Sequence, residues 1–573
     1  MNSSLSLITT LLLILSAAIG GGVIAKRLKL PILLGYIAGG VFVGNILPGV
    51  LNRSMLEVLA DGGVTLLLFT LGVEFSFQRL RKIMGTIAWA ATFQIVMTLL
   101  VFLLVFFAFG LGFLPSLIFA MAASLSSTAV VIKVLSDKGQ LDTLPGEIAT
   151  GWLVIQDLAV VPMLLLLPSI ASGQLATSSF GSLIASILVS LLKATVLLLL
   201  IIALGKRGVP RLMNAVSTMR SRELFLLVVV GLVFFAALVS FSIGLSPAVG
   251  AFLAGLLVAE TSQNHAVFSE IRPLRDLFSV VFFVTLGMVL PVTKLFAFWP
   301  MLLSVTFFAI FFKWFVVMGL GRFIGYHRIT AFSMGVMLTS MSEFGFILGK
   351  ESLGLKMITN DQYSLLVAIV FLSIFLSTPL MTSIPALYGG FRKTLGKFPK
   401  IFPEKEETFI GREGLPVSDH VVLCGYGRVG RYIGRALEMA KIPYLVVDYN
   451  SATIKELRQK GVMTVYGDPA DRETLDYAQV DKARAVVIAI PDRHTQELVI
   501  TNAKSLNRRI RIICRTHHEE DQRHLKSLGV HTIVQPEFEA AISIVGKLLT
   551  DFGVPGEDIA GKVTRLKIEH GLG

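Results

Sequence analysis

Long apolar runs fill the chain from its start to about Gly390 and constrain its fold more than any other feature. We count thirteen such runs, each long enough to cross the roughly 30 Å hydrocarbon core of a bilayer as a helix. Hydrophobic residues make up 54% of the 573 residues and charged residues 16%, a balance that excludes a soluble protein. The chain is therefore predicted to be a polytopic α-helical membrane protein. The runs are centred on Ser16, Ala38, Thr65, Met97, Ser124, Val160, Ala194, Val230, Phe252, Phe282, Lys313, Leu338 and Ile374.

The loops between the runs differ strongly in charge. Loops after odd-numbered runs are rich in Lys and Arg, as around Arg79 and Arg220, whereas the others hold little beyond Arg53, Lys294 and Lys356. Because basic loops stay on the cytoplasmic side, we expect an outside N-terminus and a cytoplasmic C-terminal domain in the cell (inner) membrane. Basic loops facing anionic lipid explain the net charge of +13, so no nucleic-acid partner is expected.

The composition becomes that of a soluble domain beyond Arg392. We predict a transmembrane domain at 1–390, a linker at 391–416, a soluble domain at 417–550, which the glycine motif described below marks as Rossmann-like, and a tail at 551–573. The chain has two cysteines, Cys424 and Cys514, both in strand-like segments, so no disulfide framework is expected. A cysteine in a buried strand is usually inert, and we assign no redox role to either.

Asp157 is the acid that most directly suggests a function. It follows Gln156 inside an uncharged apolar run from Ile148 to Ile170, roughly 15 Å from the start of this helix. A carboxylate near the middle of a bilayer is costly and is by default a functional site. The sequence therefore predicts a membrane transporter whose titratable carrier is Asp157.

The segment from His420 to Asp448 carries a dinucleotide-binding fingerprint. A strand-like run at 420–425 leads into Gly425-Tyr-Gly427-Arg428-Val429-Gly430 and a helix, and a second strand at 444–448 ends at Asp448. Such glycines let the backbone approach a pyrophosphate at the helix N-terminus, and the acid accepts hydrogen bonds from ribose hydroxyls. Further strands are predicted at 462–466, 485–490, 511–514 and 531–534.

Gly467 and Asp468 follow the third strand, at the same sheet edge as Asp448, and are predicted to contact the base or ribose. The alternative for Asp468 is a helix N-cap. No second domain for a reacting substrate follows, so this domain is expected to sense a ligand rather than catalyse a reaction. The predicted regulatory ligand is an adenine nucleotide or NAD(H).

Together these features resemble the monovalent cation:proton antiporter-2 family, and within it the Kef-type potassium efflux systems with a nucleotide-binding tail. The resemblance covers nearly the whole chain and implies an inverted-repeat sodium/proton-antiporter fold with two crossed, broken helices, working as a homodimer. The motifs that carry it are Leu67–Glu74, Ser126–Val131, Gln156-Asp157, Gly244–Gly255, Ser342–Phe346 and the glycine fingerprint.

Two clusters of small polar residues lie at the middle of the fifth and twelfth runs, as crossed broken helices require. The alternative is that such residues hold helices together by hydrogen bonds. We expect the clusters to form the ion site with Asp157. They comprise Ser124, Ser126, Ser127 and Thr128 in one run, and Thr339, Ser340, Ser342, Glu343 and Gly345 in the other.

A cation and a proton can compete for one carboxylate, because bound cation favours its ionised form and burial favours its protonated form. Since Gln156 cannot titrate, the simplest exchange is one cation for one proton, and Gln156 is expected to offer its carbonyl to the cation. Lys313 is expected to pair with Asp157 in the cation-free state, with a purely structural pair as the alternative. Glu343 is expected to balance helix dipoles or to pair with Lys313.

Three functions fit these residues: a potassium/proton antiporter, a sodium/proton antiporter and a nucleotide-gated cation channel. The channel is disfavoured because no carbonyl-lined filter such as TVGYG is present. A membrane-tethered dehydrogenase is a further alternative, and we expect no enzyme. Glutathione control, associated with the Kef-type systems, is not expected, because Arg272 stands where an acid would belong and Arg515 is followed by Thr516 and His517 rather than by a second arginine.

Overall fold

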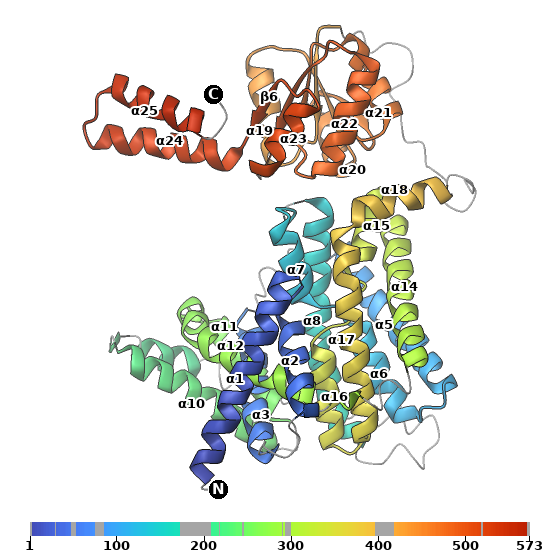
Figure 1. The fold of residues 1–573 in the computed structure, drawn as a ribbon, viewed down its shortest axis with the longest axis vertical. Helices are drawn as coiled ribbons and strands as arrows, with labels where there is room; N and C mark the ends of the chain where they lie inside the picture. The colour runs from blue at the N-terminus through green and yellow to red at the C-terminus, as the bar shows by residue number, and fades with distance from the viewer. Residues whose placement is uncertain are drawn as a thin grey trace. The chain divides into compact units, whose positions relative to one another are not determined.

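The structure is a computed structural model, and it resolves two compact units that we describe separately (Figure 1). Residues 1–134, 148–320 and 333–382 form the first unit, and residues 135–147, 321–332 and 383–573 form the second. The described residues are those outside 1–2, 29, 47–52, 75–84, 142, 172–207, 217, 220, 243–245, 289, 293–298, 396–417, 517–518 and 570–573.

The first unit is helical, as the apolar runs predict. Twelve of the thirteen predicted centres fall in its helices or at breaks between them, and the run centred on Ala194 lies outside the described residues. Among the described residues, seven helices are long and apolar enough to span a bilayer. The helices, with α7 and α15 included, are α1 (Ser3–Arg27), α2 (Ile32–Ile46), α3 (Arg53–Glu74), α5 (Thr86–Ala108), α6 (Phe113–Ser124), α7 (Thr128–Asp137), α8 (Leu144–Ala171), α10 (Arg222–Ser242), α11 (Pro247–Ala259), α12 (Asn264–Met288), α14 (Trp299–Ile324), α15 (Arg328–Met337), α16 (Phe344–Gly354) and α17 (Asn360–Thr382).

These helices form two groups within the first unit. Helices α1, α2, α3, α10, α11 and α12 pack on one another, and α5, α6, α16 and α17 pack together with α7, α8, α14 and α15 (Figure 1). Small residues allow the close approach in the first group. A Cβ added to Gly72 on α3 would lie 2.3 Å from Phe252 O, and one added to Gly255 on α11 would lie 2.1 Å from Phe69 O.

The second unit contains a six-stranded parallel sheet in the order β3-β2-β1-β4-β5-β6, the doubly wound arrangement of a dinucleotide-binding fold. Its strands are β1 (Val421–Cys424), β2 (Tyr444–Asp448), β3 (Met463–Tyr466), β4 (Ala485–Ile488), β5 (Arg511–Arg515) and β6 (Thr532–Val534). Both faces of β1 and β2 are buried, which explains their unbroken apolar sequences. Each predicted strand is present, with ends that differ by one or two residues.

The remaining elements of the second unit are helical. Helix α18 continues five residues into the predicted linker, and α25 lies within the predicted tail and occupies most of it. These elements are α18 (Ile384–Leu395), α19 (Arg428–Met439), α20 (Ser451–Gln459), α21 (Arg472–Tyr477), the 3-10 turn η1 (Val480–Lys482), α22 (Arg493–Leu506), α23 (Glu519–Ser527), α24 (Pro536–Asp551) and α25 (Gly556–Glu569).

Candidate functional site

Two interrupted helices meet in the first unit, at the two polar clusters. Residues 125–127 separate α6 from α7, and residues 338–343 separate α15 from α16. The interruptions contact each other directly: Ser126 Oγ donates to Leu338 O at 2.8 Å, and Ser127 N donates to Ser340 Oγ at 3.4 Å. Each hydroxyl therefore satisfies a backbone group that the interruption leaves without a helical partner. The predicted pair of broken helices is confirmed.

Asp157 lies on α8 beside the first interruption. Its Oδ2 accepts a hydrogen bond of 2.8 Å from Thr128 Oγ1, at the first residue of α7. Glu343 is close enough to interact electrostatically with it. Asp157, Thr128 and Glu343 all retain part of their accessible surface, whereas Ser126 and Ser127 are buried. Asp157 thus lies at the helix crossing as a partly buried residue.

Gln156, next to Asp157, is completely buried and both ends of its amide are engaged. Its Oε1 accepts from Ser126 N at 2.8 Å, and its Nε2 donates to Gln94 Oε1 at 2.6 Å. We expected the Gln156 carbonyl to bind the cation. In the structure this carbonyl instead accepts a hydrogen bond from the backbone amide of Ser126. Sequence reasoning missed Gln94, although a glutamine in the middle of the apolar run 86–108 was a visible signal.

Lys313 does not pair with Asp157 in this structure, contrary to expectation. Its side chain is completely buried, and Nζ donates to Leu125 O at 2.6 Å and to Ser340 O at 2.7 Å. Leu125 is the C-cap of α6, and Ser340 lies three residues beyond the end of α15. The ammonium therefore lies at two C-terminal helix ends, where the macrodipole favours a positive charge.

Glu343 occupies the complementary position at the N-terminal helix ends. It is the N-cap of α16, and it accepts hydrogen bonds from the Ser127 hydroxyl and from the backbone of Ala129, in the first turn of α7. A negative charge is favourable at helix N-termini. This position agrees with the expected role of Glu343 in balancing helix dipoles, and its Oε2 has no hydrogen-bond partner among the described residues.

The fingerprint glycines of the second unit have distinct conformational reasons to be glycine. Gly425 turns the chain with a φ of 91°, in the left-handed region that favours glycine. A Cβ on Gly430 would lie 2.2 Å from Gly425 O, whereas one on Gly427 would meet nothing within 4 Å. Gly430 thus lets α19 pack on the β1 turn, and Gly427 leaves open space at the N-terminus of α19.

A cavity lies at this turn, on the carboxyl edge of the sheet. Of the predicted ligand-binding residues, the cavity is lined by Gly425, Gly427, Arg428 and Asp448. Other polar residues also line the cavity, and the sequence analysis did not assign them to a ligand site. They include Arg431, Asn450, Arg515 and Glu537. Arginines beside a helix N-terminus suit an anionic ligand such as a nucleotide phosphate.

Four other predicted residues, Val429, Gly430, Gly467 and Asp468, do not line this cavity. Asp468 Oδ1 accepts from Ala470 N at 3.0 Å, and Asp471 is the N-cap of α21, so the alternative role of helix N-cap is wrong for Asp468. A Cβ on Gly467 would lie 2.7 Å from the Thr474 hydroxyl, which gives that glycine a packing role.

Asp448 is held by the backbone around the cavity. Its Oδ2 accepts from Tyr426 N at 2.6 Å and its Oδ1 from Asn450 N at 2.8 Å. Burial raises the pKa of the Asp448 carboxyl, and these amide donors oppose the shift. Burial also lowers the pKa of Arg515 and raises the pKa of the Cys424 thiol, which favours the protonated form of this cysteine.

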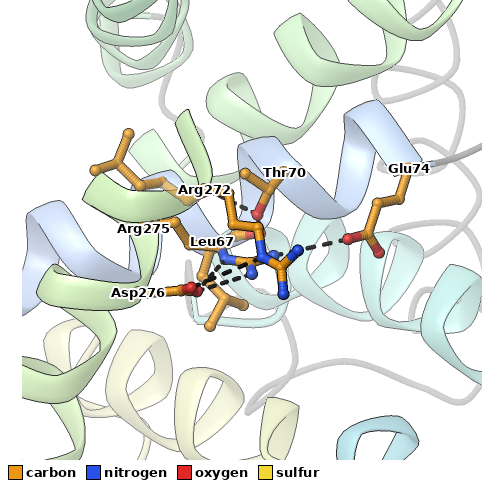
Figure 2. A network of polar contacts seen from close by, with 7 residues as sticks. Leu67, Thr70, Glu74, Arg272, Arg275 and Asp276 are labelled. Carbon is orange, nitrogen blue, oxygen red and sulfur yellow. Dashed lines mark hydrogen bonds and ion pairs between the residues drawn. The ribbon is translucent and has the colours of Figure 1, made fainter. Parts of the chain in front are cut away.

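Arg272, which stands where the resemblance to the Kef-type systems predicts an acid, lies inside α12. Figure 2 shows Arg275 between Asp276 and Glu74. Arg275 Nη2 is 2.8 Å from Asp276 Oδ1, and Arg275 Nη1 is 3.6 Å from Glu74 Oε1, which ties α12 to α3. Arg272 lies 3.9 Å from Asp276 Oδ2. These charges are paired within the first unit as ordinary surface ion pairs.

The family described as sodium/hydrogen exchanger, transmembrane, matches residues 13–384, and the TrkA-N domain matches residues 421–536. The chain belongs to the sodium/hydrogen exchanger family, in its Kef-type form with a TrkA-N tail. It is a membrane transporter and not an enzyme.

Relatives of known name match both parts of the chain. YbaL of Escherichia coli (strain K12), named as a cation/proton antiporter, is 30% identical over 558 residues and covers 96% of this chain and 98% of its own. KefB of Alkalimonas amylolytica, named as a K+ efflux antiporter, is 28% identical over 548 residues, which are 95% of this chain and 81% of its own. The solved TrkA-N domain of YbaL is 30% identical, with a TM-score of 0.23, and covers 24% of this chain and 99% of that domain.

Proposed function

We propose that this protein exchanges a monovalent cation, K+ in preference to Na+, for a proton, and that Asp157 carries both. The observation that supports this most directly is the position of Asp157, a partly buried residue whose carboxylate is bonded to Thr128 at the crossing of two broken helices. Discontinuous helices at a midplane are where transporters of this architecture bind ions. The preference for K+ rests on the named activity of KefB.

Competition at one carboxylate couples the two fluxes. The ionised Asp157 binds the cation, and a proton arriving from the other side displaces it. If an empty, charged carboxylate cannot cross, each transit carries one cation or one proton. Gln156 contributes no titratable group, so the exchange is one for one and electrically neutral. Ser126, Ser127 and Thr128 line the crossing, while Lys313 and Glu343 hold its helix ends.

The decisive experiment replaces Asp157 by Asn in proteoliposomes. Asp157→Asn keeps the size of the side chain and an acceptor for Thr128, but it cannot exchange a proton. We expect K+-dependent proton movement to fall to the level of empty vesicles while the purified protein stays monodisperse. Asp361→Asn, at the first turn of α17, is the matched control and should retain exchange.

Retained exchange in Asp157→Asn would overturn the assignment. The same vesicles separate the alternatives: equal rates with Na+ would favour a sodium/proton antiporter. Cation flux that ignores an imposed pH gradient would favour the channel.

We also propose that the second unit regulates transport by binding an adenine nucleotide or NAD(H) in the cavity at Gly427, Arg428 and Asp448. In this proposal residues 1–390 carry out transport and residues 417–550 regulate it. The regulatory domain lies in the cytoplasm, and the N-terminus lies outside. Basic residues at the cytoplasmic loops support this orientation.

The functional unit is proposed to be a homodimer. Large apolar side chains are exposed on α24 and α25, including Ile544, Leu548, Phe552 and Ile568, and neither helix has a buried residue. An apolar face of this kind on a soluble domain suits self-association. A second copy of the chain offers the same face, and two such faces would cover each other.

A further inference from the structure

Gln94, on α5, has a completely buried side chain whose amide is fully bonded. Its Nε2 donates to Ser124 O at 3.0 Å and to Thr98 Oγ1 at 3.0 Å. Its Oε1 accepts from Trp152 Nε1 at 3.1 Å and from Gln156 Nε2 at 2.6 Å. An amide group offers two donors and two acceptor positions, so every one is used.

The chemistry of these partners fixes which way each amide points. An indole N–H can only donate, so the Gln94 atom facing Trp152 is the oxygen. A backbone carbonyl can only accept, so the atom facing Ser124 O is the nitrogen. The Gln94 oxygen then requires a donor from Gln156, which directs the Gln156 carbonyl to the amide of Ser126 in the interrupted helix. Turning over either amide would set donor against donor or acceptor against acceptor.

We infer that Gln94 is a positioning residue for the ion site: through Gln156 it fixes the interruption between α6 and α7 next to Asp157. The inference rests on the proposed function of Asp157. Gln94 also joins the C-terminal carbonyl of α6, at Ser124, to the helix that carries the acid. The distance and angle between Asp157 and Thr128 are thereby set from α5.

The same network selects a neutral amide at position 156. A carboxylate there would present an acceptor to Gln94 Oε1, and Gln94 cannot turn to offer its nitrogen because Trp152 and Ser124 hold it. Only a protonated acid would fit. Gln94 and Trp152 thus restrict proton carriage at this pair of positions to Asp157, which keeps the exchange one for one.

The test measures K+/H+ exchange by the full-length protein in proteoliposomes over a range of K+ concentrations. Gln94→Met keeps the length of the side chain and removes all four hydrogen bonds. We expect the apparent KM for K+ to rise about tenfold, as for residues that orient metal ligands, with Vmax at saturating K+ within about twofold of wild type. Thr92→Val is the matched control on α5, because the Thr92 hydroxyl bonds only its own helix, at Ala88 O.

The combination with Gln156→Met separates positioning from packing. Because Gln94 acts through Gln156, the double variant should have the KM of Gln156→Met alone. An unchanged KM in Gln94→Met, or multiplicative effects in the double variant, would overturn the inference. If Gln94→Met does not fold, Trp152→Phe decides: loss of one donor should raise KM about threefold, and a wild-type KM would reject the network.

The experiments distinguish failure of this inference from failure of the proposed function. Loss of exchange in Asp157→Asn together with a wild-type KM in Gln94→Met would reject only the positioning role. Retained exchange in Asp157→Asn would reject the carrier itself.

Discussion

Backbone groups hold the charged side chains of this protein in position. Asp448, in the second unit, is an example. Two backbone amides hold its carboxylate at the cavity edge, while burial raises its pKa. The ionised form is the one that accepts from Tyr426 N, Asn450 N and a ligand hydroxyl together. Protonation therefore removes an acceptor at the proposed nucleotide site.

Nucleotide binding should weaken on acidification. Above its raised pKa Asp448 is ionised and binding is strongest; as the pH falls through that pKa the affinity should drop, at a pH above the ~4 usual for Asp. Calorimetric titration of the full-length protein with AMP, ADP and NADH at several pH values measures this. Asp448→Asn should bind about tenfold more weakly at neutral pH, because a charge-assisted hydrogen bond is lost, and should show no such pH dependence. A wild-type pH profile in Asp448→Asn would remove Asp448 from the site.

At the scale of elements, the two interrupted helices meet with C-terminal end beside C-terminal end and N-terminal end beside N-terminal end. Two C-terminal ends converge on the Lys313 ammonium, and two N-terminal ends converge on Glu343. A buried charge is tolerated when such groups satisfy it, and removing one partner leaves the others unpaired. We therefore expect Lys313 to stabilise the crossing rather than to take part in exchange.

Lys313→Met tests this role. The variant leaves two buried carbonyls, Leu125 O and Ser340 O, without their donor, at a cost on the order of 2 kcal/mol. We expect a lower melting temperature in detergent, measured by loss of the monodisperse peak on heating, with an unchanged pH profile of exchange at low temperature. Lys356→Met, at an exposed position, is the control. A shifted pH profile with unchanged stability would restore the expected pairing with Asp157.

The elements themselves could be predicted well from the sequence, because hydropathy and glycine spacing are local signals. The runs of apolar residues gave the spans, the serine and threonine clusters located both interruptions, and the fingerprint gave β1, α19 and β2. The partners of Lys313 could not be predicted in this way. They lie 188 and 27 residues away along the chain, and only the crossing of the helices brings them together. Gln94 itself was visible in its apolar run, but three of its partners lie 30, 58 and 62 residues away and could not be predicted for the same reason.

At the scale of the whole molecule, the proposed self-association would allow one regulatory signal to reach two transport domains at once. The exposed apolar side chains Ile544, Leu548 and Phe552 recur every four residues, so they share one face along α24 and its C-terminal end. Covering this face by the same face of a partner would join two TrkA-N domains and, through them, two transport domains. One nucleotide-bound dimer would then respond as a unit.

Cysteine crosslinking can detect this pairing because the two native cysteines are not expected to react with the crosslinker. Burial raises the pKa of both native thiols, that of Cys514 to about 12, so neither reacts at neutral pH. Single cysteines placed at Ile544, Leu548 and Phe552 in the membrane-embedded protein should give a crosslinked dimer with a short bis-maleimide at one position or more. Lys482→Cys, exposed on the same domain, should be labelled by a maleimide but remain monomeric. If all three α24 positions are labelled equally well and none crosslinks, the face has another occupant and the dimer is not formed through it.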